Sequence, residues 1–577
     1  MASERTGERQ RAPASRWGTL MQCVVAPGPR PLVFLLVGAA VWLLILAVFP
    51  PINYDELALV HFAWLIGQGA VPYTDFHAVH PPFFALLVAP LLRVLPEAFG
   101  SMLVLRLVNL LASVAVLVLL VRLLFARTEE SRERWLALGG LVIMASHPRV
   151  LQALAEFRPD HLSTALTLGA LSVAMHSTGQ RARRWFVASA LFTIAMVFNA
   201  KLILIPFFTA LVLTVEEGRR GLRALGELLA GTLTGVTSSL VLTWFVGHLW
   251  AIDFRLLWEQ AYVYHEAIRE TFTRSFGLAK TLGGQVKPHW GLPIVALLLG
   301  LIGLFTEARR GHWDRVRVPL ILAAYAIIQP LWVPFPYKQY SYTINLVWAA
   351  PLALGLVWAQ RWRPRATPTL VAALVVVGLL LNGVRTGRIV ARGGMLSQMQ
   401  LGNALLSLAP PGQPVAALLP VHPIFRRDAT FAWIYTHNPG GRETEEVMAR
   451  MPGYQERFSH GGYLRELKAN PPGLIVLHSP YAHTEYRRAV ADFLAFGALR
   501  YDEVRVGEVR VFVRHDRSAS GGHTAHPFVS GRRSNLIGDV FGLGKTSSMV
   551  GCVVSGTLGG PTRERALRLY HDGVANG

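Results

Sequence analysis

The sequence has few cysteines and few charged residues. Its two cysteines, Cys23 and Cys552, lie near opposite ends of the 577 residues, which excludes a disulfide framework and a pair of thiolates spaced to bind a metal. Charged residues make up 16% of the chain, whereas a soluble domain carries about 25%. Because the shortage falls in long apolar segments, the sequence predicts a polytopic α-helical membrane protein.

The formal net charge of +21 would suit a nucleic-acid partner, but the arginines occur in short clusters between the apolar segments. That distribution follows the positive-inside rule, so we expect contact with membrane lipid and no nucleic acid. A nucleotide site is not predicted either. Residues 538–546 look like a phosphate-binding loop, but the pattern G-x-x-x-x-G-K-T requires glycine at position 539, which is Asp539.

The apolar segments predict eleven transmembrane spans, with the N-terminus inside and the C-terminus outside. Residues 1–31 are polar and basic, and we expect a cytoplasmic tail before a first span at 32–50. Residues 81–95 are short for a span, which favours a re-entrant or interfacial helix. Residues 185–215 lie between two arginine clusters, which predicts a hairpin that turns at 199–201. The other predicted spans lie near residues 102–125, 136–155, 161–177, 224–249, 291–306, 317–333, 340–359 and 368–385.

This topology places every arginine cluster inside, whereas carboxylates, single basic residues and prolines gather outside. We therefore expect the chemistry on the outer face. In the loop 250–290, aromatic and charged residues alternate, which favours an interfacial amphipathic helix. The predicted outer loops cover residues 54–80, 156–161, 199–201, 250–290 and 334–340.

The C-terminal part of the chain is amphiphilic and has the character of a soluble domain. Residues 386–515 predict a small extracytoplasmic α/β domain, with strands at 473–477 and 504–513 and a helix at 485–496. Residues 516–577 are rich in glycine, serine and arginine and show no sustained periodicity, so we expect a disordered tail.

Two adjacent carboxylates, Asp55 and Glu56, directly follow the first span. A carboxylate near the bilayer surface can act as a general base that accepts a hydroxyl proton, and both residues are candidates for this role. Two alternatives stay open: a solvated loop, or acidic residues in the first turn of a helix, where they interact favourably with its dipole.

Three lone basic residues of the outer face are candidates to bind a phosphate: Arg158, Lys201 and Lys338. Ordinary snorkelling to the membrane interface is the alternative for each. Lys201 is the strongest candidate, because it lies at the tip of a tight apolar hairpin, where a cation without a partner is costly. Asp160 is placed to orient Arg158 or to bind a sugar, or else to cap the helix that follows.

The remaining candidates lie in two outer loops. His77 and His80, with Asp75, are candidates to join Asp55 or Glu56 around a divalent metal ion, although hydrogen bonding within the loop is favoured over a metal. Aromatic side chains there either stack on a sugar or anchor the chain at the interface. The expected substrate-binding residues are Tyr54, Tyr73, Asp75, His80, Asp160, Tyr337 and Tyr340.

The order of these motifs resembles a known family. Tyr54-Asp55-Glu56, then Pro72-Tyr73-Thr74-Asp75-Phe76 and His80-Pro81-Pro82, resemble the first outer loop of the GT-C glycosyltransferases, in particular the protein O-mannosyltransferases and the lipid A aminoarabinose transferases. Weaker matches follow in Arg158-Pro159-Asp160, in Lys201 with Pro206, and in Tyr337–Tyr340. The resemblance covers roughly residues 30–385 and implies a GT-C-like transmembrane catalytic domain at 32–385, with a first outer loop at 51–82.

The resemblance implies an enzyme of the inner cell membrane that moves a sugar from a polyprenyl-phosphate donor to a lipid, glycan or protein acceptor on the outer face. The family's catalytic carboxylate corresponds to Asp55, and one-step displacement would invert the anomeric centre. A transporter or flippase is the main rival, but it would place ionisable residues near the centres of the spans, which here hold almost no Asp or Glu. A non-catalytic scaffold is the second rival, and it predicts that Asp55 can be replaced without loss.

Overall fold

The structure is a computed structural model. It describes residue 38 and residues 41–78, 80–125, 130–176, 181–263, 292–332, 338–392, 394–409, 411–418, 421–431, 456–457, 459–477, 484–497, 499–507 and 509–515. The predicted tails at 1–31 and 516–577 and most of the predicted helix in the 250–290 loop lie outside the described residues.

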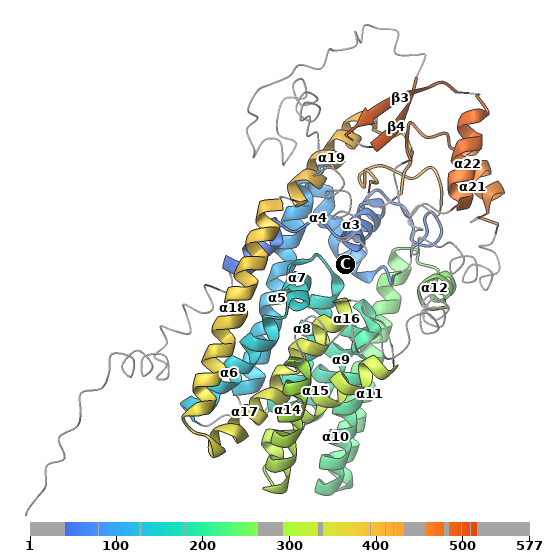
Figure 1. Ribbon diagram of the computed structural model, residues 1–577. Coiled ribbons are helices and arrows are strands. Elements are labelled where there is room, and N and C mark those ends of the chain that lie inside the picture. The colour runs from blue at the N-terminus through green and yellow to red at the C-terminus, as the bar shows by residue number, and fades with distance from the viewer. Residues whose placement is uncertain are drawn as a thin grey trace, which may run out of the picture.

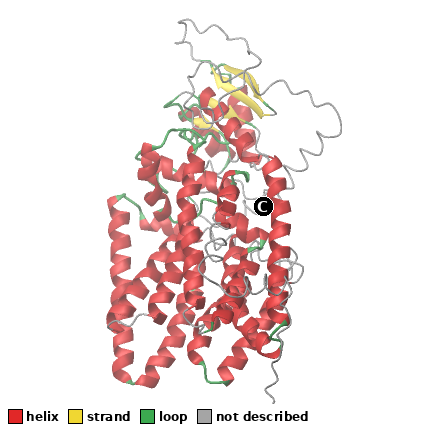
Figure 2. Ribbon diagram, turned by 90° about the vertical axis from the view of Figure 1, so that its left-hand side faces the viewer, coloured by secondary structure: helices red, strands yellow, loops and turns green. Residues whose placement is uncertain are grey.

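The fold is a bundle of long helices with a small unit of helices and strands at one end (Figures 1 and 2). The bundle contains α5 (Ser101–Phe125), α6 (Ser131–Ala145), α7 (Pro148–Ala155), α8 (Pro159–His176), α9 (Arg181–Phe198), α10 (Leu204–Arg220), α11 (Leu222–Leu249), α14 (Leu292–Arg309), α15 (Trp313–Trp332), α16 (Lys338–Val347), α17 (Ala349–Trp362) and α18 (Ala366–Arg392). Helices α3 (Tyr54–Gly67), α4 (Phe83–Val94) and α12 (Phe254–Leu257) lie at the end that carries the strands.

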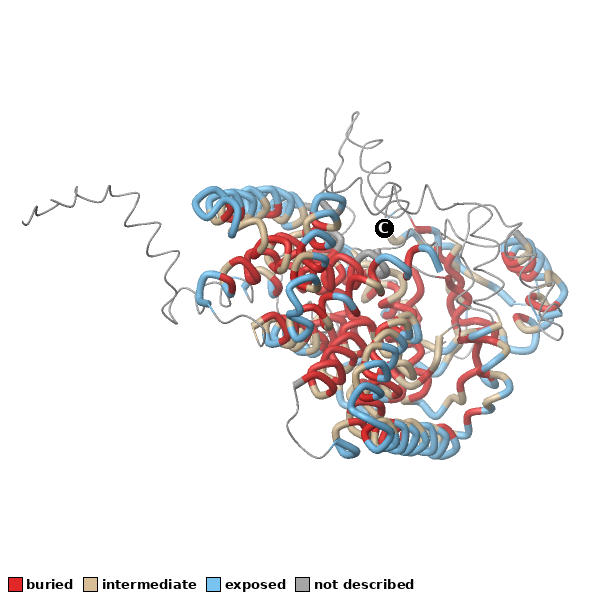
Figure 3. The backbone as a smooth tube through the Cα atoms, turned by 90° about the horizontal axis from the view of Figure 1, so that it is seen from below, coloured by how far each residue is buried: buried red, intermediate tan, exposed pale blue. Residues whose placement is uncertain are grey.

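The outer helices present apolar side chains outward. Leu233 and Phe245 on α11 are 65% and 51% exposed, and Leu380 on α18 is 64% exposed, while buried residues concentrate in the interior (Figure 3). Such a surface suits lipid and not water. Among the described residues, four helical segments are long and apolar enough to cross a membrane: Ser101–Phe125, Leu222–Leu249, Tyr342–Trp362 and Ala366–Leu408. The larger number of eleven spans stays a prediction.

The predicted break at 199–201 is confirmed. Helix α9 ends at Phe198, the short 3-10 helix η1 covers Ala200–Leu202, and α10 begins at Leu204. The Asn199 side chain caps η1 by accepting a hydrogen bond from the backbone N–H of Lys201 at 3.1 Å. The short helix predicted for residues 81–95 is also present, as the twelve residues of α4.

One predicted span is divided into two helices, and a second is interrupted at a single residue. The segment 136–155 is broken between α6 and α7, where Pro148 occupies the first position of the new helix, a position that tolerates its missing N–H. Within 340–359, Trp348 alone separates α16 from α17, where Pro351 removes a backbone donor, and Tyr342–Trp362 still forms one segment long enough to cross a membrane. At the end of the bundle, α18 continues past residue 385 to Arg392.

The C-terminal unit contains a four-stranded mixed sheet in the order β1-β2-β4-β3. Strand β1 pairs parallel to β2, and the other pairs are antiparallel. The predicted strand at 473–477 is confirmed as β2, whereas 504–513 is a hairpin that turns at Gly507, whose φ of 61° favours glycine. The unit's elements are α19 (Gly394–Leu408), β1 (Val415–Ala416), α21 (His460–Ala469), β2 (Leu474–Val476), α22 (Thr484–Ala495), β3 (Tyr501–Val506) and β4 (Val509–Arg514).

The arginine clusters meet at the opposite end of the bundle. Glu217 on α10 forms ion pairs with Arg184 of α9 and Arg220 of its own helix, and Glu307 on α14 is bound by Arg310 and by Arg361 of α17. The arginines predicted to lie on one side therefore do lie together. A cavity of 960 Å³ opens among them, lined by residues that include Glu133, Glu216, Arg220, Arg315, Arg317 and Arg361.

Candidate functional site

The first turn of α3 fixes two neighbouring carboxylates in different environments. Asn53 precedes the helix, and its side chain accepts the backbone N–H of Asp55 at 3.1 Å, while Glu56 Oε2 accepts the backbone N–H of Asn53 at 2.9 Å. This reciprocal capping box satisfies backbone donors that a helix start leaves unpaired. Asp55 keeps 15% of its side chain exposed, whereas Glu56 is fully buried.

Glu56 forms a bidentate ion pair with Arg106 of α5. The distances are 2.8 Å from Arg106 Nε to Glu56 Oε1 and 2.6 Å from Nη2 to Oε2. Burial raises the pKa of the Glu56 carboxyl, but the Arg106 guanidinium more than offsets this, so the pKa lies below its ordinary value. Glu56 Oε1 also accepts the backbone N–H of Phe157 at 2.7 Å. Glu56 thus ties α3 to α5 and to the residue before Arg158.

A polar stripe on α5 holds the segment that leads to Arg158. Arg106, Asn109 and Ser113 follow the i, i+3, i+7 spacing of one helix face. The Asn109 amide donates to the Glu156 carbonyl at 2.8 Å, and the Ser113 hydroxyl donates to the Leu154 carbonyl at 2.7 Å. Buried polar groups in an apolar helix need such partners, and here the partners fix the end of α7.

Asp55 meets a cluster of charged residues that comes from the start of α8 and the tip of the α9–α10 hairpin. Arg158 Nη1 lies 2.6 Å from Asp55 Oδ2, and Arg158 Nε lies 3.2 Å from Asp160 Oδ2. Glu156 Oε2 is 3.6 Å from the same Arg158 Nη1. On its other oxygen, Asp160 Oδ1 accepts from Asn199 at 2.9 Å and lies 3.5 Å from Lys201 Nζ.

The two cations of this cluster, Arg158 and Lys201, differ in their surroundings. Burial alone would lower the pKa of Arg158, but the neighbouring Asp55, Asp160 and Glu156 carboxylates raise it well above its ordinary value. The guanidinium is therefore permanently charged, and its Nη1 lies 2.6 Å from Asp55 Oδ2. Lys201 is more accessible than Arg158, with 30% of its side chain exposed against 6%.

Other side chains of the first outer loop form hydrogen bonds that hold the loop itself in shape. Tyr73 has a φ of 68°, a strained value for a non-glycine residue, and its hydroxyl donates to the His80 carbonyl at 2.8 Å. Asp75 is exposed and accepts the backbone N–H of Val71 at 2.7 Å. The buried His77 ring contacts Gln260 at 2.9 Å, and burial lowers its pKa to about 4.

The predicted site residues thus fall into three groups. Asp55, Arg158, Asp160 and Lys201 come together. Glu56, Tyr73, Asp75, His77 and His80 have structural partners near the cluster, and Tyr54 is the half-buried first residue of α3. Tyr337 lies outside the described residues, and α16 contains Lys338 and Tyr340, whose side chains are not among those described.

Several residues of the site were not predicted. Glu156, Asn199 and the stripe on α5 complete the cluster, and Tyr342 of α16 packs its ring edge-on against His161 of α8, with centroids 5.1 Å apart. The candidate metal set of Asp55, His77 and His80 is not among the groups of described residues whose ligand atoms lie close together, and a metal there stays a prediction. Within the described residues, one other set of three does have suitable atoms close together: His61, His422 and Asp428.

The comparisons with known proteins agree with this architecture. No protein-family model matches the sequence, and no curated protein matches it. Among solved structures, ArnT from Cupriavidus metallidurans bound to undecaprenyl phosphate matches with a TM-score of 0.51 at 14% sequence identity, over 84% of this chain and 98% of that chain. The apo structure of the same protein matches equally well, with a TM-score of 0.51 at 13% identity.

This chain has an ArnT-like fold. The likeness to ArnT covers 84% of this chain. At 14% identity it establishes the arrangement of the helices and confirms the resemblance at the level of the fold. Which reaction the chain carries out depends on the residues of its own site.

Proposed function

We propose that this protein is a membrane glycosyltransferase that takes a sugar from a polyprenyl-phosphate donor. The observation that carries the proposal is a chain of ion pairs at one end of a GT-C-like bundle, in which Asp55 pairs with Arg158, Arg158 with Asp160, and Asp160 with Lys201. The matching ArnT structure is bound to undecaprenyl phosphate, a lipid of the class that we propose as carrier here. The acceptor is a lipid, glycan or protein hydroxyl, and the active end and the C-terminal unit face away from the cytoplasm.

Asp55 is the general base of the proposed reaction. The acceptor hydroxyl oxygen attacks the anomeric carbon of the sugar, and the hydroxyl proton moves to the Asp55 carboxylate. The bond between the anomeric carbon and the phosphate oxygen breaks, and its electron pair stays on the phosphate. Polyprenyl phosphate leaves as the anion, the anomeric centre is inverted, and Asp55 later releases its proton to water.

The cations of the cluster stabilise the leaving phosphate. Lys201 is the more accessible of the two, and Asp160 and Asn199 hold its segment in place. Arg158 orients the Asp55 carboxyl through their 2.6 Å contact, and as a fixed cation beside the base it stabilises the negative charge that develops on the leaving group. Glu56 has both oxygens bound to Arg106, so we assign it the role of fixing the loop that carries Arg158.

The test uses the full-length protein in liposomes with radiolabelled polyprenyl-phosphate sugars and a membrane extract as acceptor. We expect sugar transfer by the wild type. We expect Asp55→Asn to lose transfer while it still binds the donor lipid. Asp314→Asn is the matched control and should transfer normally, because Asp314 is 84% exposed and lies at the arginine-rich end of the bundle.

A flippase with the same fold would give a different result. It would move the labelled lipid across the bilayer of the same liposomes without transferring the sugar, and Asp55→Asn would not separate binding from transfer. That result would contradict the proposed reaction and leave the fold assignment standing.

A further inference from the structure

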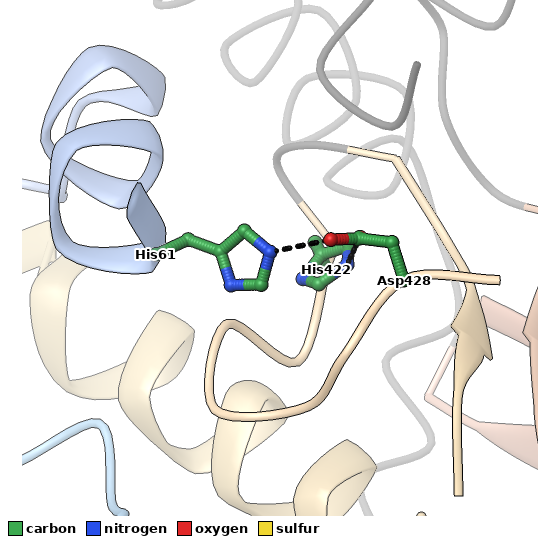
Figure 4. Close-up of side chains that lie close together, drawn as sticks. All are labelled: His61, His422 and Asp428. Carbon is green, nitrogen blue, oxygen red and sulfur yellow. Dashed lines mark hydrogen bonds and ion pairs between the residues drawn. The ribbon is translucent and has the colours of Figure 1, made fainter. Parts of the chain in front are cut away.

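Three buried side chains meet where α3 contacts the C-terminal unit. His61 lies in the middle of α3, and His422 and Asp428 come from the loop that follows β1 (Figure 4). His61 and His422 have no exposed side-chain surface, and Asp428 has 6%. Their ligand atoms all lie within 4.8 Å of one another.

Both ring nitrogens of His61 face hydrogen-bond acceptors, and a neutral ring cannot donate to both. Its Nδ1 lies 2.6 Å from the carbonyl oxygen of Ile424, and its Nε2 lies 2.8 Å from Asp428 Oδ2. Both neighbours are acceptors, but a neutral imidazole has one N–H. A cation that binds Nε2 resolves the conflict, because Nδ1–H then donates to Ile424 while Nε2 and the carboxylate both act as ligands.

The second histidine presents the same atom to the same carboxylate. His422 Nε2 lies 2.7 Å from Asp428 Oδ1, and the two imidazole rings are 4.6 Å apart. Two imidazoles and one carboxylate are ligands that Zn²⁺ accepts, at about 2.0–2.2 Å each. Tetrahedral ligands at that distance are roughly 3.3 Å apart, so the two N···O contacts of 2.7 and 2.8 Å need to lengthen by about half an ångström to admit an ion between them.

Hydrogen bonds with the backbone hold two of these three side chains in place, as is usual around protein-bound metal ions. A metal-binding histidine usually donates its other N–H to a backbone carbonyl or a carboxylate, and Ile424 supplies that carbonyl to His61. The backbone on each side of Asp428 is bonded to β1, since Val415 N–H donates to Arg427 and Ala429 N–H donates to Val415, both at 2.8 Å. A helix and a strand thus fix two of the three ligands.

We propose that His61, His422 and Asp428 bind a Zn²⁺ ion that fastens the C-terminal unit to α3. One ligand of the ion, His61, lies on α3 six residues after Asp55. Other contacts follow the same seam, such as the Phe431 carbonyl, which accepts the backbone N–H of His77 at 3.0 Å. The ion would hold α3 against the loop between β1 and α21. This site is independent of the proposed transfer reaction.

The test measures bound metal in the full-length protein, purified without chelators, incubated with zinc and freed of excess metal by gel filtration. We expect about one zinc ion per chain, because a closed group of this kind binds one ion. In His422→Ala and Asp428→Ala we expect zinc affinity to fall on the order of 100-fold or more, since even the loss of an outer-shell partner costs 10–100-fold.

His460→Ala is the matched control. His460 also pairs with an aspartate at 2.8 Å, Asp492, but this pair is partly exposed, and it is not part of the three-residue group. The control should retain the zinc of the wild type. Wild-type protein that binds no zinc, or His422→Ala protein that retains it fully, would overturn the proposal in favour of a proton-only network.

A second measurement does not depend on whether the variants fold. Wild-type protein loaded with Co²⁺ should show the visible absorption of a low-coordinate cobalt site, and zinc should displace it. Zinc should also raise the thermal unfolding temperature of the wild type, because a ligand that binds the folded state stabilises it. The absence of both signals would contradict a metal between α3 and the C-terminal unit.

Discussion

The two ends of the helix bundle both bury carboxylates, but they pair them differently. At the end with the arginine clusters, four buried or partly buried glutamates are each shared by at least two arginines: Glu133, Glu216, Glu217 and Glu307. At the other end, the single guanidinium of Arg158 contacts three carboxylates, those of Asp55, Glu156 and Asp160.

This difference indicates that one end of the bundle sets the orientation of the protein in the membrane and the other end holds the candidate base. A cluster in which arginine is in excess has its carboxylates neutralised, and it suits the cytoplasmic surface of a membrane. A cluster in which carboxylates are in excess can accept a proton. The 960 Å³ cavity lies at the arginine-rich end, so volume alone would have pointed to the end without a candidate base.

The largest expected effect is on stability, and it distinguishes the neighbours Glu56 and Asp55. Because Glu56 and Arg106 are 0% and 1% exposed, Glu56→Gln leaves a buried guanidinium without its counter-ion. We expect a loss of about 3–5 kcal/mol in the free energy of unfolding, measured by thermal or denaturant unfolding in detergent. Asp55→Asn should lose much less. Normal stability with lost transfer in Glu56→Gln would make Glu56 the base instead.

Acid should weaken the loop at the site end through His77. Burial lowers its pKa from an ordinary 6.5 to about 4, so between these values the unfolded chain binds more protons than the folded one. Stability is therefore complete above pH 6.5 and is lost as the pH falls through 4, by roughly 3 kcal/mol for this group. Unfolding followed against pH should show this slope, and it should flatten in His77→Gln. An unchanged slope in the variant would assign the acid sensitivity elsewhere.

Arg158→Lys tests whether the shared guanidinium contributes more than charge. Lysine keeps the positive charge but loses the planar fork that reaches Asp55 and Asp160 together. We expect kcat/KM for transfer to fall by about 10–100-fold, since a hydrogen bond to a charged group contributes about 1.5–3 kcal/mol. A variant with wild-type kcat/KM would show that a point charge suffices.

The smallest expected effect on transfer comes from the arginine-rich end. Glu217→Gln removes a carboxylate whose arginine partners Arg184 and Arg220 are 15% and 44% exposed, so water can replace part of the contact. We expect about 1 kcal/mol of lost stability and unchanged kcat/KM. A large loss of transfer at normal stability would contradict the division of roles between the two ends.

The sequence was sufficient for features that have a local signal. The turn at 199–201 was predicted from the arginine clusters on both sides, and the order of the loop motifs pointed to Asp55, Arg158, Asp160 and Lys201. The breaks before Pro148 and near Pro351 also had a local signal, which the continuous hydrophobicity of these segments concealed. The same holds for the polar stripe on α5, whose helical spacing could have been recognised.

The remaining features depend on contacts between distant segments. Glu56 and Arg106 are 50 residues apart, and His61 and Asp428 are 367 apart. Nothing in the local pattern around either residue specifies its partner. The local pattern therefore presented Asp55 and Glu56 together as candidates, and the family resemblance favoured Asp55. Packing against α5 gives the physical difference between them, because it pairs Glu56 with Arg106.

The most direct test of the account is the rate of sugar transfer in a single turnover, with donor lipid already bound to wild-type or Asp55→Asn protein. We predict that the rate falls by about 10²–10⁴-fold in the variant, the usual contribution of a general base, with donor affinity unchanged. An equal rate in the two proteins would contradict the claim that the carboxylate-rich end of the bundle carries the chemistry through Asp55.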